Sequence, residues 1–332
     1  MATSADSGSL EDLLAAVICR PEPAEADIAE LCRRLREDPV TAAFESVGFP
    51  LAGRARERLD VFARSGALCP SVKLDVAGHP VEAHISRREL WRFYLPVCQA
   101  ARLLAERRRG RVLVGVAGSG ASGKSVFARL LQEAFNRGLA DAVGPAALCP
   151  LDGFHYPNAY LDAHFTARLD GTRVPMREMK GALETFDAEA FARCLERLVS
   201  EPSVSLPRYD RRIHDSVPDG IRIGPAERVV FVEGNFLLLD TGSWARAAGL
   251  LDLSLFLAQP LAAVQQAMIA RHMLGGRSRP DAVAHFENVD RPNFFRCMES
   301  AGRADLVVRR DAHQRVVGIE AAPFDSPPVA VI

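Results

Sequence analysis

The stretch that most limits how this chain can fold reads GSGASGKS. It begins at Gly118 and has the spacing G-x-x-x-x-G-K-[ST], which is typical of a phosphate-binding loop. The β-branched run at 112–116 predicts a buried strand before the loop, and the periodicity of 126–135 predicts a helix after it. A loop with these flanks predicts an α/β fold in which the loop lies at one end of a parallel sheet.

The residue types of this loop fit the binding of a nucleoside triphosphate. Glycines lack the Cβ atom that would keep phosphate oxygens away from backbone N–H groups. Lys124 is placed to reach the β- and γ-phosphates, and the Ser125 hydroxyl is a suitable ligand for Mg²⁺. The alternative is a glycine-rich turn with an incidental lysine, and the flanking strand and helix argue against it. The residues predicted to bind the nucleotide are Gly118, Ser119, Gly120, Ala121, Ser122, Gly123, Lys124, Ser125 and Val126.

Charge and composition narrow the class of partner. The 332 residues have a formal net charge of −1, which argues against a general surface for nucleic acid or anionic membranes. No apolar run is long enough to span a bilayer. The seven cysteines are dispersed, without C-x-x-C or metal-ligand spacing, which indicates reduced thiols in a cytoplasmic protein. We therefore expect small-molecule partners, with a homodimer left open.

The chain divides into two predicted regions. Residues 1–85 are expected to form a mainly helical extension: a disordered start over 1–9, two helices between Leu10 and Leu35, and a helix near Arg54 to Ala63. Short extended pieces are expected at 72–76 and 81–83, and no chemistry is assigned here. The sequence leaves open whether this extension packs on the rest or forms a subunit contact.

Residues 86–332 are expected to form the phosphate-loop domain. A capping box, Ser86 with Glu89, predicts the start of a helix that runs toward Gly110. Five apolar runs predict a five-stranded parallel sheet with helices on both faces, and in such sheets ligands bind beyond the carboxyl ends of the strands. These runs are 112–116, 146–151, 229–232, 253–257 and 306–308. Helices are expected from Asp187 to Val199, Pro260 to Met273, Arg279 to Phe286 and Pro292 to Ala301.

Two acids follow predicted strands, at the edge where the loop also lies. Asp152 comes after AALCPL and Glu233 after VVFV. An acid in this place can hold Mg²⁺ or accept the proton of an attacking hydroxyl. The alternatives are an Asx-turn for Asp152 and a helix-start charge for Glu233. The sequence does not decide which acid takes which role.

Three further motifs resemble one family of phosphate-loop enzymes. DGFHYPN begins at Asp152, KGALETFD at Lys180 and EGNFLLLD at Glu233. Together they are similar to the phosphoribulokinase, uridine kinase and pantothenate kinase family, and most similar to type I pantothenate kinases and their sugar-kinase-like relatives. The resemblance covers about 94–308. It implies a P-loop NTPase fold, ATP and Mg²⁺ as cofactors, and Asp152 as the catalytic base.

The resemblance also implies an acceptor site. The segment at 207–220 combines Y-D-x-x-x-H, similar to uridine kinases, with D-x-x-P-D-G, similar to pantothenate kinases. Arg211 and Met268 stand where pantothenate kinases have a histidine and an aromatic residue, so a sugar, sugar acid or nucleoside-like acceptor ranks above pantothenate. The implied acceptor-binding residues are Asp152, His155, Tyr156, Lys180, Tyr209, Arg211, His214 and Asn293.

A segment rich in arginine and glycine follows a predicted strand and helix. ARHMLGGRSR, which begins at Ala270, resembles the family's lid, expected at about 271–290, and Arg271 matches its lid arginine. A plain surface loop is the alternative. The leading hypothesis is an ATP-dependent kinase acting on a hydroxyl, with Asp152, Lys124 and Arg271 catalytic and with Ser125 and Glu233 on the metal. The competing hypothesis is a nucleotide-dependent switch that hydrolyses ATP without an acceptor.

Overall fold

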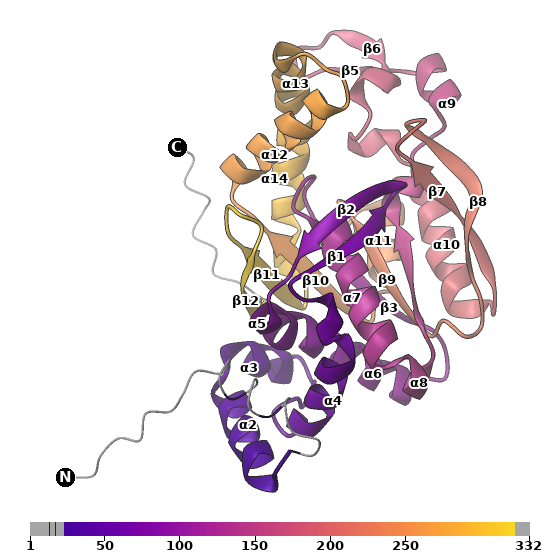
Figure 1. The fold of residues 1–332 in the computed structure, drawn as a ribbon. Helices are drawn as coiled ribbons and strands as arrows, with labels where there is room; N and C mark the ends of the chain where they lie inside the picture. The colour runs from indigo at the N-terminus through magenta and orange to yellow at the C-terminus, as the bar shows by residue number, and fades with distance from the viewer. Residues whose placement is uncertain (1–12, 14–16, 18–22, 323–332) are drawn as a thin grey trace.

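The computed structural model describes Leu13, Val17 and residues 23–322 of the chain (Figure 1). The expected disorder over 1–9 and most of the helix expected after Leu10 lie outside the described residues. The second helix expected there is present as α2, Glu25–Glu37.

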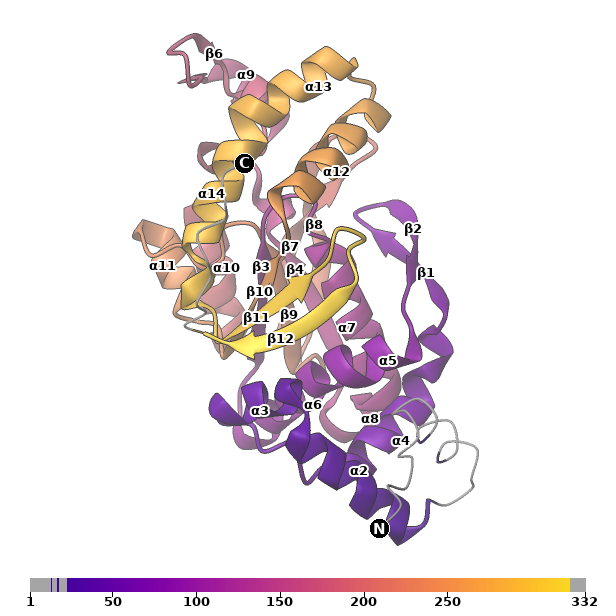
Figure 2. The ribbon, with the colours of Figure 1, turned by 90° about the vertical axis from the view of Figure 1, so that its left-hand side faces the viewer.

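A six-stranded sheet forms the centre of the structure, in the order β12-β11-β10-β3-β9-β4. Five of the strands are parallel, which confirms the predicted fold class. The sixth, β12, pairs antiparallel with β11 at the edge (Figure 2). This strand is absent from the predicted sheet because its alternating pattern, VVGIEA, is short and interrupted by a glycine. The bounds are β3 Val112–Gly118, β4 Ala146–Pro150, β9 Val229–Gly234, β10 Leu253–Ala258, β11 Leu306–Arg310 and β12 Val316–Ala321.

Both faces of the sheet are covered because its strands are apolar on both sides. Val112, Val114 and Val116 pack into one core, and Leu113 and Ala117 pack into the other. The first core is closed by α6 and α7, the second by α10 and α11 (Figure 1). The bounds of the covering helices are α6 Leu95–Arg107, α7 Lys124–Gly138, α8 Ala140–Val143, α10 Ala188–Ser200, α11 Gly242–Ala248 and α14 Arg291–Glu299.

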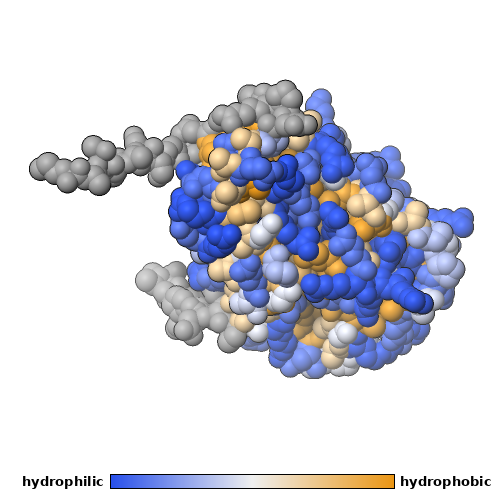
Figure 3. All heavy atoms as spheres, turned by 90° about the horizontal axis from the view of Figure 1, so that it is seen from below, coloured by the Kyte–Doolittle hydropathy of each residue, from blue (hydrophilic) through white to orange (hydrophobic). Residues whose placement is uncertain are grey.

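The region before residue 86 packs on the first core. Phe62 of α4 lies edge-on to Trp91, with ring centroids 5.7 Å apart, and both side chains are buried. A hairpin of β1 and β2 lies beside α7 (Figure 2). Hydrophilic residues cover much of the underside of this region, with apolar residues between them (Figure 3). The bounds are α3 Pro39–Ser46, α4 Ala55–Ser65, η1 Gly66–Leu68, β1 Ser71–Val76, β2 His79–His84, α5 Arg87–Glu89 and η2 Leu90–Tyr94.

Several of the remaining elements lie beyond the carboxyl ends of the parallel strands (Figure 1). On one side α12 and α13 form the segment predicted as a lid. On the other, β7 and β8 form a hairpin that carries the predicted acceptor segment. The bounds are η3 Leu151–Phe154, α9 Asn158–Ala163, β5 Phe165–Ala167, β6 Arg173–Pro175, η4 Met176–Met179, η5 Leu183–Thr185, β7 Val204–Asp210, β8 Asp215–Ile223, α12 Leu261–Leu274, α13 Arg279–His285, η6 Phe286–Asp290 and η7 Ala301–Arg303.

Two general features of the described residues concern helix length and the cysteines. Within the described residues, every helix is too short or too polar to cross a lipid bilayer. Six of the seven cysteines are described and all six are free thiols, as the sequence predicts; Cys19 lies outside the described residues.

Candidate active site

The phosphate loop joins β3 to α7 in a conformation that depends on glycine. Gly123 has φ of 79° and Gly118 has φ of 153°. A Cβ atom on Gly118 would lie 2.8 Å from Ser122 Oγ and 3.0 Å from the carbonyl oxygen of Leu257, both too close for a side chain. The chain can therefore turn sharply here, and α7 begins at Lys124, which is buried.

The turn between β11 and β12 braces the loop from outside. Arg310 Nη1 donates to the Ser122 carbonyl oxygen over 2.7 Å, and Gln314 Nε2 donates to that of Ala121 over 3.4 Å. No local sequence pattern predicts these contacts, because 188 residues separate the first two partners and 193 the second two.

The two predicted acids lie side by side below the loop. In the sheet, Pro150 of β4 is paired with Glu233 of β9, so Asp152, two residues further on, is brought close to Glu233. Ser125 Oγ donates to Glu233 Oε1 over 2.9 Å. Burial raises the pKa of Glu233, and the charge of Asp152 adds to this effect.

Asp152 is held in its ionised form. Burial by itself raises the pKa of the Asp152 carboxyl, but nearby groups outweigh burial and bring the pKa below its ordinary value. These groups are His155, Lys124, Arg271 and Arg211. Because burial lowers the pKa of His155 to about 4, that ring is neutral at pH 7. The lysine and the two arginines therefore carry the effect, and Asp152 can accept a proton at neutral pH.

A cleft of about 820 Å³ opens beside Asp152 and brings most of the predicted site residues together. Tyr156 does not line it and stacks instead on Tyr160, with centroids 4.4 Å apart. Glu233 lies beneath the cleft, behind Ser125. The predicted residues in the lining are Gly120, Lys124, Ser125, Asp152, His155, Lys180, Tyr209, Arg211, His214, Arg271 and Asn293.

Aromatic rings and amides line the side of the cleft where the acceptor is predicted to bind. His155 packs on Phe186 with centroids 3.8 Å apart and lies 5.6 Å from the ring of Tyr209. Burial raises the pKa of Tyr209 to about 12, so its hydroxyl stays protonated and can donate a hydrogen bond. Asn293 Nδ2 donates to the Gly181 carbonyl oxygen over 2.8 Å, which joins α14 to the K-G motif.

Lys180 is fixed at the centre of this side. Its Nζ donates to Asn158 Oδ1 and to the His214 carbonyl oxygen, both over 2.7 Å. It also lies 5.1 Å from the ring centroid of Tyr209. Burial lowers the pKa of Lys180 to about 8. The side chain thus ties the K-G motif to the acceptor segment.

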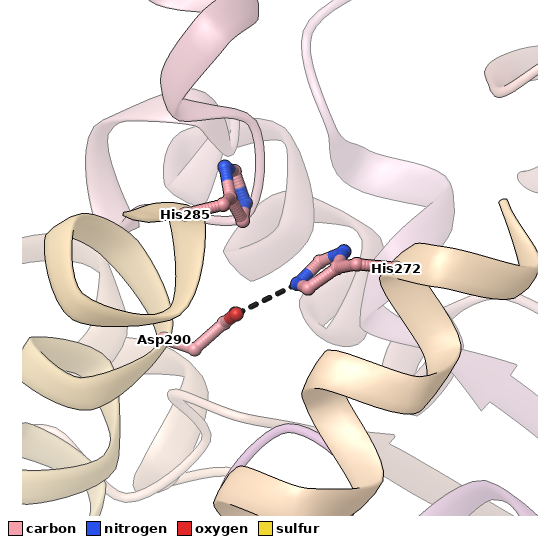
Figure 4. A group of neighbouring side chains, drawn as sticks. All are labelled: His272, His285 and Asp290. Carbon is pink, nitrogen blue, oxygen red and sulfur yellow. Dashed lines mark hydrogen bonds and ion pairs between the residues drawn. The ribbon is translucent and has the colours of Figure 1, made fainter. Parts of the chain in front are cut away.

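The predicted lid contributes the opposite wall. Arg271 of α12 lies close enough to Asp152 to lower its pKa, and buried Met268 lies against Gly120 of the loop. At the end of α12, His272 Nε2 lies 2.7 Å from Asp290 Oδ2, and the ring of His285 lies 4.7 Å away (Figure 4). These contacts hold α12 against α13 and η6.

Several cleft residues were missed by the sequence analysis. His79 comes from the β1–β2 hairpin, in the region to which no chemistry was assigned, and the Ala77 carbonyl oxygen there accepts a hydrogen bond from the Arg211 backbone. Asn235 follows the strand that carries Glu233 and also lines the cleft. Its place in EGN was a usable signal, whereas His79 is brought in by tertiary packing alone.

One family of proteins and several individual proteins are similar to this chain. The model of the Phosphoribulokinase / Uridine kinase family matches residues 113–317. The Escherichia coli (strain K12) protein YggC, itself uncharacterized, is 31% identical over 242 residues, covering 71% of this chain and 94% of the relative. A Schizosaccharomyces pombe protein provisionally named a uridine kinase is 32% identical over 204 residues, covering 60% of this chain and 83% of that one.

One solved structure is also similar to this chain. The crystal structure of a Silicibacter sp. TM1040 protein, suggested to be a fructose transport system kinase, has a TM-score of 0.55 and 31% sequence identity. The match covers 64% of this chain and 96% of that one. The matched part therefore accounts for nearly the whole of that protein.

Proposed function

Because the chain belongs to the Phosphoribulokinase / Uridine kinase family of P-loop kinases, we propose that it transfers the γ-phosphoryl group of ATP to a hydroxyl of a small polar metabolite. One observation carries the proposal. An ionised Asp152, partly shielded from solvent, lies in the same cleft as Lys124 and Ser125 of the phosphate loop, with a separate wall of polar and aromatic side chains beyond it. A site that only hydrolysed ATP would have no use for this second wall.

Each of the main cleft residues has a separate role in the proposed reaction. Asp152 orients the acceptor hydroxyl and takes its proton while the hydroxyl oxygen forms a bond to the γ-phosphorus. The bond from that phosphorus to the bridging oxygen of ADP breaks, and the electron pair leaves with ADP. Lys124 and Arg271 balance the charge on the transferred group, and α12 and α13 exclude water from it.

A magnesium ion fits the loop. Ser125 Oγ and Glu233 Oε1 are oxygen donors 2.9 Å apart, which is the type of ligand that Mg²⁺ prefers. When bound, Mg²⁺ supplies charge neutralisation to the triphosphate. Ser125 would hold it directly, and Glu233 directly or through water.

The acceptor is proposed to be a sugar, a sugar acid or a nucleoside-like polyol, with pantothenate less expected. Hydrogen-bond donors and one aromatic ring face are available to such a molecule in the cleft, from Tyr209, Lys180, His214 and Asn293. The cytoplasm is the proposed location, in keeping with the free thiols of the described cysteines.

A coupled assay of ADP release tests the proposal. Purified protein is supplied with Mg²⁺ and ATP and with nucleosides, sugars, sugar acids, sugar phosphates or pantothenate in turn. The expected result is ADP release that depends on at least one of these acceptors. ADP release at one rate with and without every acceptor would support the competing role, a nucleotide-dependent switch.

A further inference from the structure

The cleft carries far more positive than negative side chains. Among the described residues, seven lysines and arginines line it, against two carboxylates. The cations are Lys124, Arg177, Lys180, Arg211, Arg212, Arg271 and Arg277, and the carboxylates are Asp152 and Asp290. The chain as a whole has a net charge of −1, so this excess is local to the cleft.

Four of the seven cations already have a negative partner, either an acid of the chain or the proposed triphosphate. Arg177 Nη1 lies 3.5 Å from Asp162 Oδ2, and Arg212 Nη2 lies 2.7 Å from Asp210 Oδ2. Lys124 and Arg271 match the charge of a magnesium-bound triphosphate, which is about −2. These four cations need no further anion.

Arg211 lies at the end of the cleft that holds the two acids. It lies near Asp152 and Glu233, whose negative charges oppose the effect of burial on its pKa. Its Nε is buried without a hydrogen-bond partner in the described structure, next to the place where the phosphoryl group is transferred. We therefore assign Arg211 to the reacting end of the cleft, together with Arg271.

Arg277 differs from the other cations of the cleft in its partners. Among the described residues, no acceptor reaches its buried Nη1 atom, and no ion pair to its guanidinium is found within 4 Å. Asp290, the second carboxylate of the cleft, is engaged by His272 over 2.7 Å (Figure 4). A buried guanidinium N–H without a partner is costly, so this position is suited to an anionic ligand.

Arg277 lies on the acceptor side of the lid. It is close to His285, the last residue of α13, and the ring of His285 in turn lies by the backbone of Lys180. Lys180 uses two of its three N–H donors on Asn158 and His214, which leaves one for a ligand. Asp215 lies near Lys180 and offsets part of its charge. Arg277 is therefore the stronger of the two candidate anion-binding groups.

We infer that the acceptor carries an anionic group, a carboxylate or a phosphate, and that Arg277 binds it with Lys180 as a second donor. This inference rests on the proposed kinase function and narrows it. A polyol acid or a sugar phosphate would place a hydroxyl at Asp152 and its anionic group at Arg277. A neutral sugar or nucleoside would leave the Arg277 donor unpaired.

The first test does not depend on turnover. The full-length protein is saturated with Mg²⁺ and a non-hydrolysable ATP analogue, and inorganic phosphate is then titrated calorimetrically. We expect one phosphate site, weakened about tenfold or more by Arg277→Gln and by Lys180→Gln, as expected for the loss of a charge-assisted hydrogen bond. Arg177→Gln is the matched control, because Arg177 lines the same cleft but is paired with Asp162. Its affinity for phosphate should equal that of the wild type.

The second test compares acceptors in matched pairs: gluconate with glucitol, and fructose 6-phosphate with fructose. The anionic member of a pair should show the higher kcat/KM, and Arg277→Gln should raise KM for that member and not for the neutral one. Phosphate binding that Arg277→Gln leaves unchanged would overturn the inference, as would a preference for the neutral members. If no acceptor stimulates ADP release, the proposed kinase function fails, and the phosphate titration still decides the role of Arg277.

Discussion

Ser125 Oγ lies 2.9 Å from Glu233 Oε1 and donates a hydrogen bond to it. The first residue lies in the first turn of α7, after the phosphate loop, and the second is the last but one residue of β9, 108 residues away. The bond therefore links the nucleotide-binding loop to the acid that lies beside Asp152. A metal ion bound to Ser125 would meet a carboxylate already in position.

Glu233→Gln tests this arrangement. The amide keeps the shape and the hydrogen bond but removes the negative charge, so the Mg²⁺ concentration for half-maximal turnover should rise about 10- to 100-fold. Titration of Mg²⁺ at a fixed ATP concentration measures this half-maximal Mg²⁺ concentration. Glu320→Gln, on the edge strand β12 outside the cleft, is the control and should behave as the wild type. An unchanged Mg²⁺ requirement in Glu233→Gln would remove Glu233 from the metal site.

Asp152→Asn should separate binding from chemistry. The amide cannot accept the proton of the acceptor, so turnover should fall about 10²- to 10⁴-fold. Nucleotide affinity, measured by calorimetry with Mg²⁺ and a non-hydrolysable analogue, should change little, because Lys124 and the loop remain. Asp170→Asn, on an exposed turn, serves as the control. Turnover of Asp152→Asn near that of the wild type would rule out Asp152 as the base.

The pH dependence of turnover should be governed by Lys180 on the alkaline side. Its pKa is lowered to about 8 by burial, so the side chain is charged below that pH and loses its charge as the pH rises through it. We expect kcat/KM for an anionic acceptor to fall above pH 8. Lys180→Arg should abolish this fall, since arginine keeps its charge throughout. On the acid side, the positive charges of Lys124, Arg271 and Arg211 keep the pKa of Asp152 below its ordinary value, so the proposed base should stay ionised throughout the neutral range.

Most of the donor half of the site could be predicted from the sequence. Local sequence patterns reveal the phosphate loop, Gly118 to Ser125, and the strands before Asp152 and Glu233. Because parallel strands end at one edge of the sheet, the loop and the two acids can be placed together. The capping box of Ser86 and Glu89 and the cap at Asp187 were predicted correctly, since each depends on three or four neighbouring residues.

The proposed acceptor half depends on contacts that no local pattern reveals. His79 reaches the cleft through a hairpin in the N-terminal region, and Arg310 braces the phosphate loop from the far end of the chain. Tyr156, implied by the resemblance, stacks on Tyr160 outside the cleft lining. Such placements follow from how distant elements pack, so the sequence could suggest the acceptor segment but not its full set of side chains.

The contact between His272 and Asp290 should position the lid. Because His272 follows Arg271 directly, loss of the 2.7 Å contact should loosen Arg271, and His272→Ala should lower kcat about tenfold or more. Asp290→Ala should act in the same way, and the double variant should be no worse than either single one. His313→Ala, on an exposed turn, is the control. Fully additive losses would mean that the two residues act separately.

The N-terminal region should unfold together with the phosphate-loop domain. Phe62 is 2% exposed and lies edge-on to Trp91, and neighbouring Val61 packs against Gly138 of α7. Phe62→Ala should therefore lower the free energy of unfolding of the whole chain by about 3–5 kcal/mol. Val317→Ala, at a side chain that is 56% exposed, should change it little.

Trp91 provides a reporter for this test, because the chain has only two tryptophans. In a Trp244→Phe background, fluorescence follows the region around Trp91, while far-UV circular dichroism follows the whole chain. Coincident urea transitions, both shifted to lower urea by Phe62→Ala, are expected if one core joins the two regions. If Phe62→Ala shifted the fluorescence transition but not the circular dichroism transition, the residues before 86 would unfold independently of the rest.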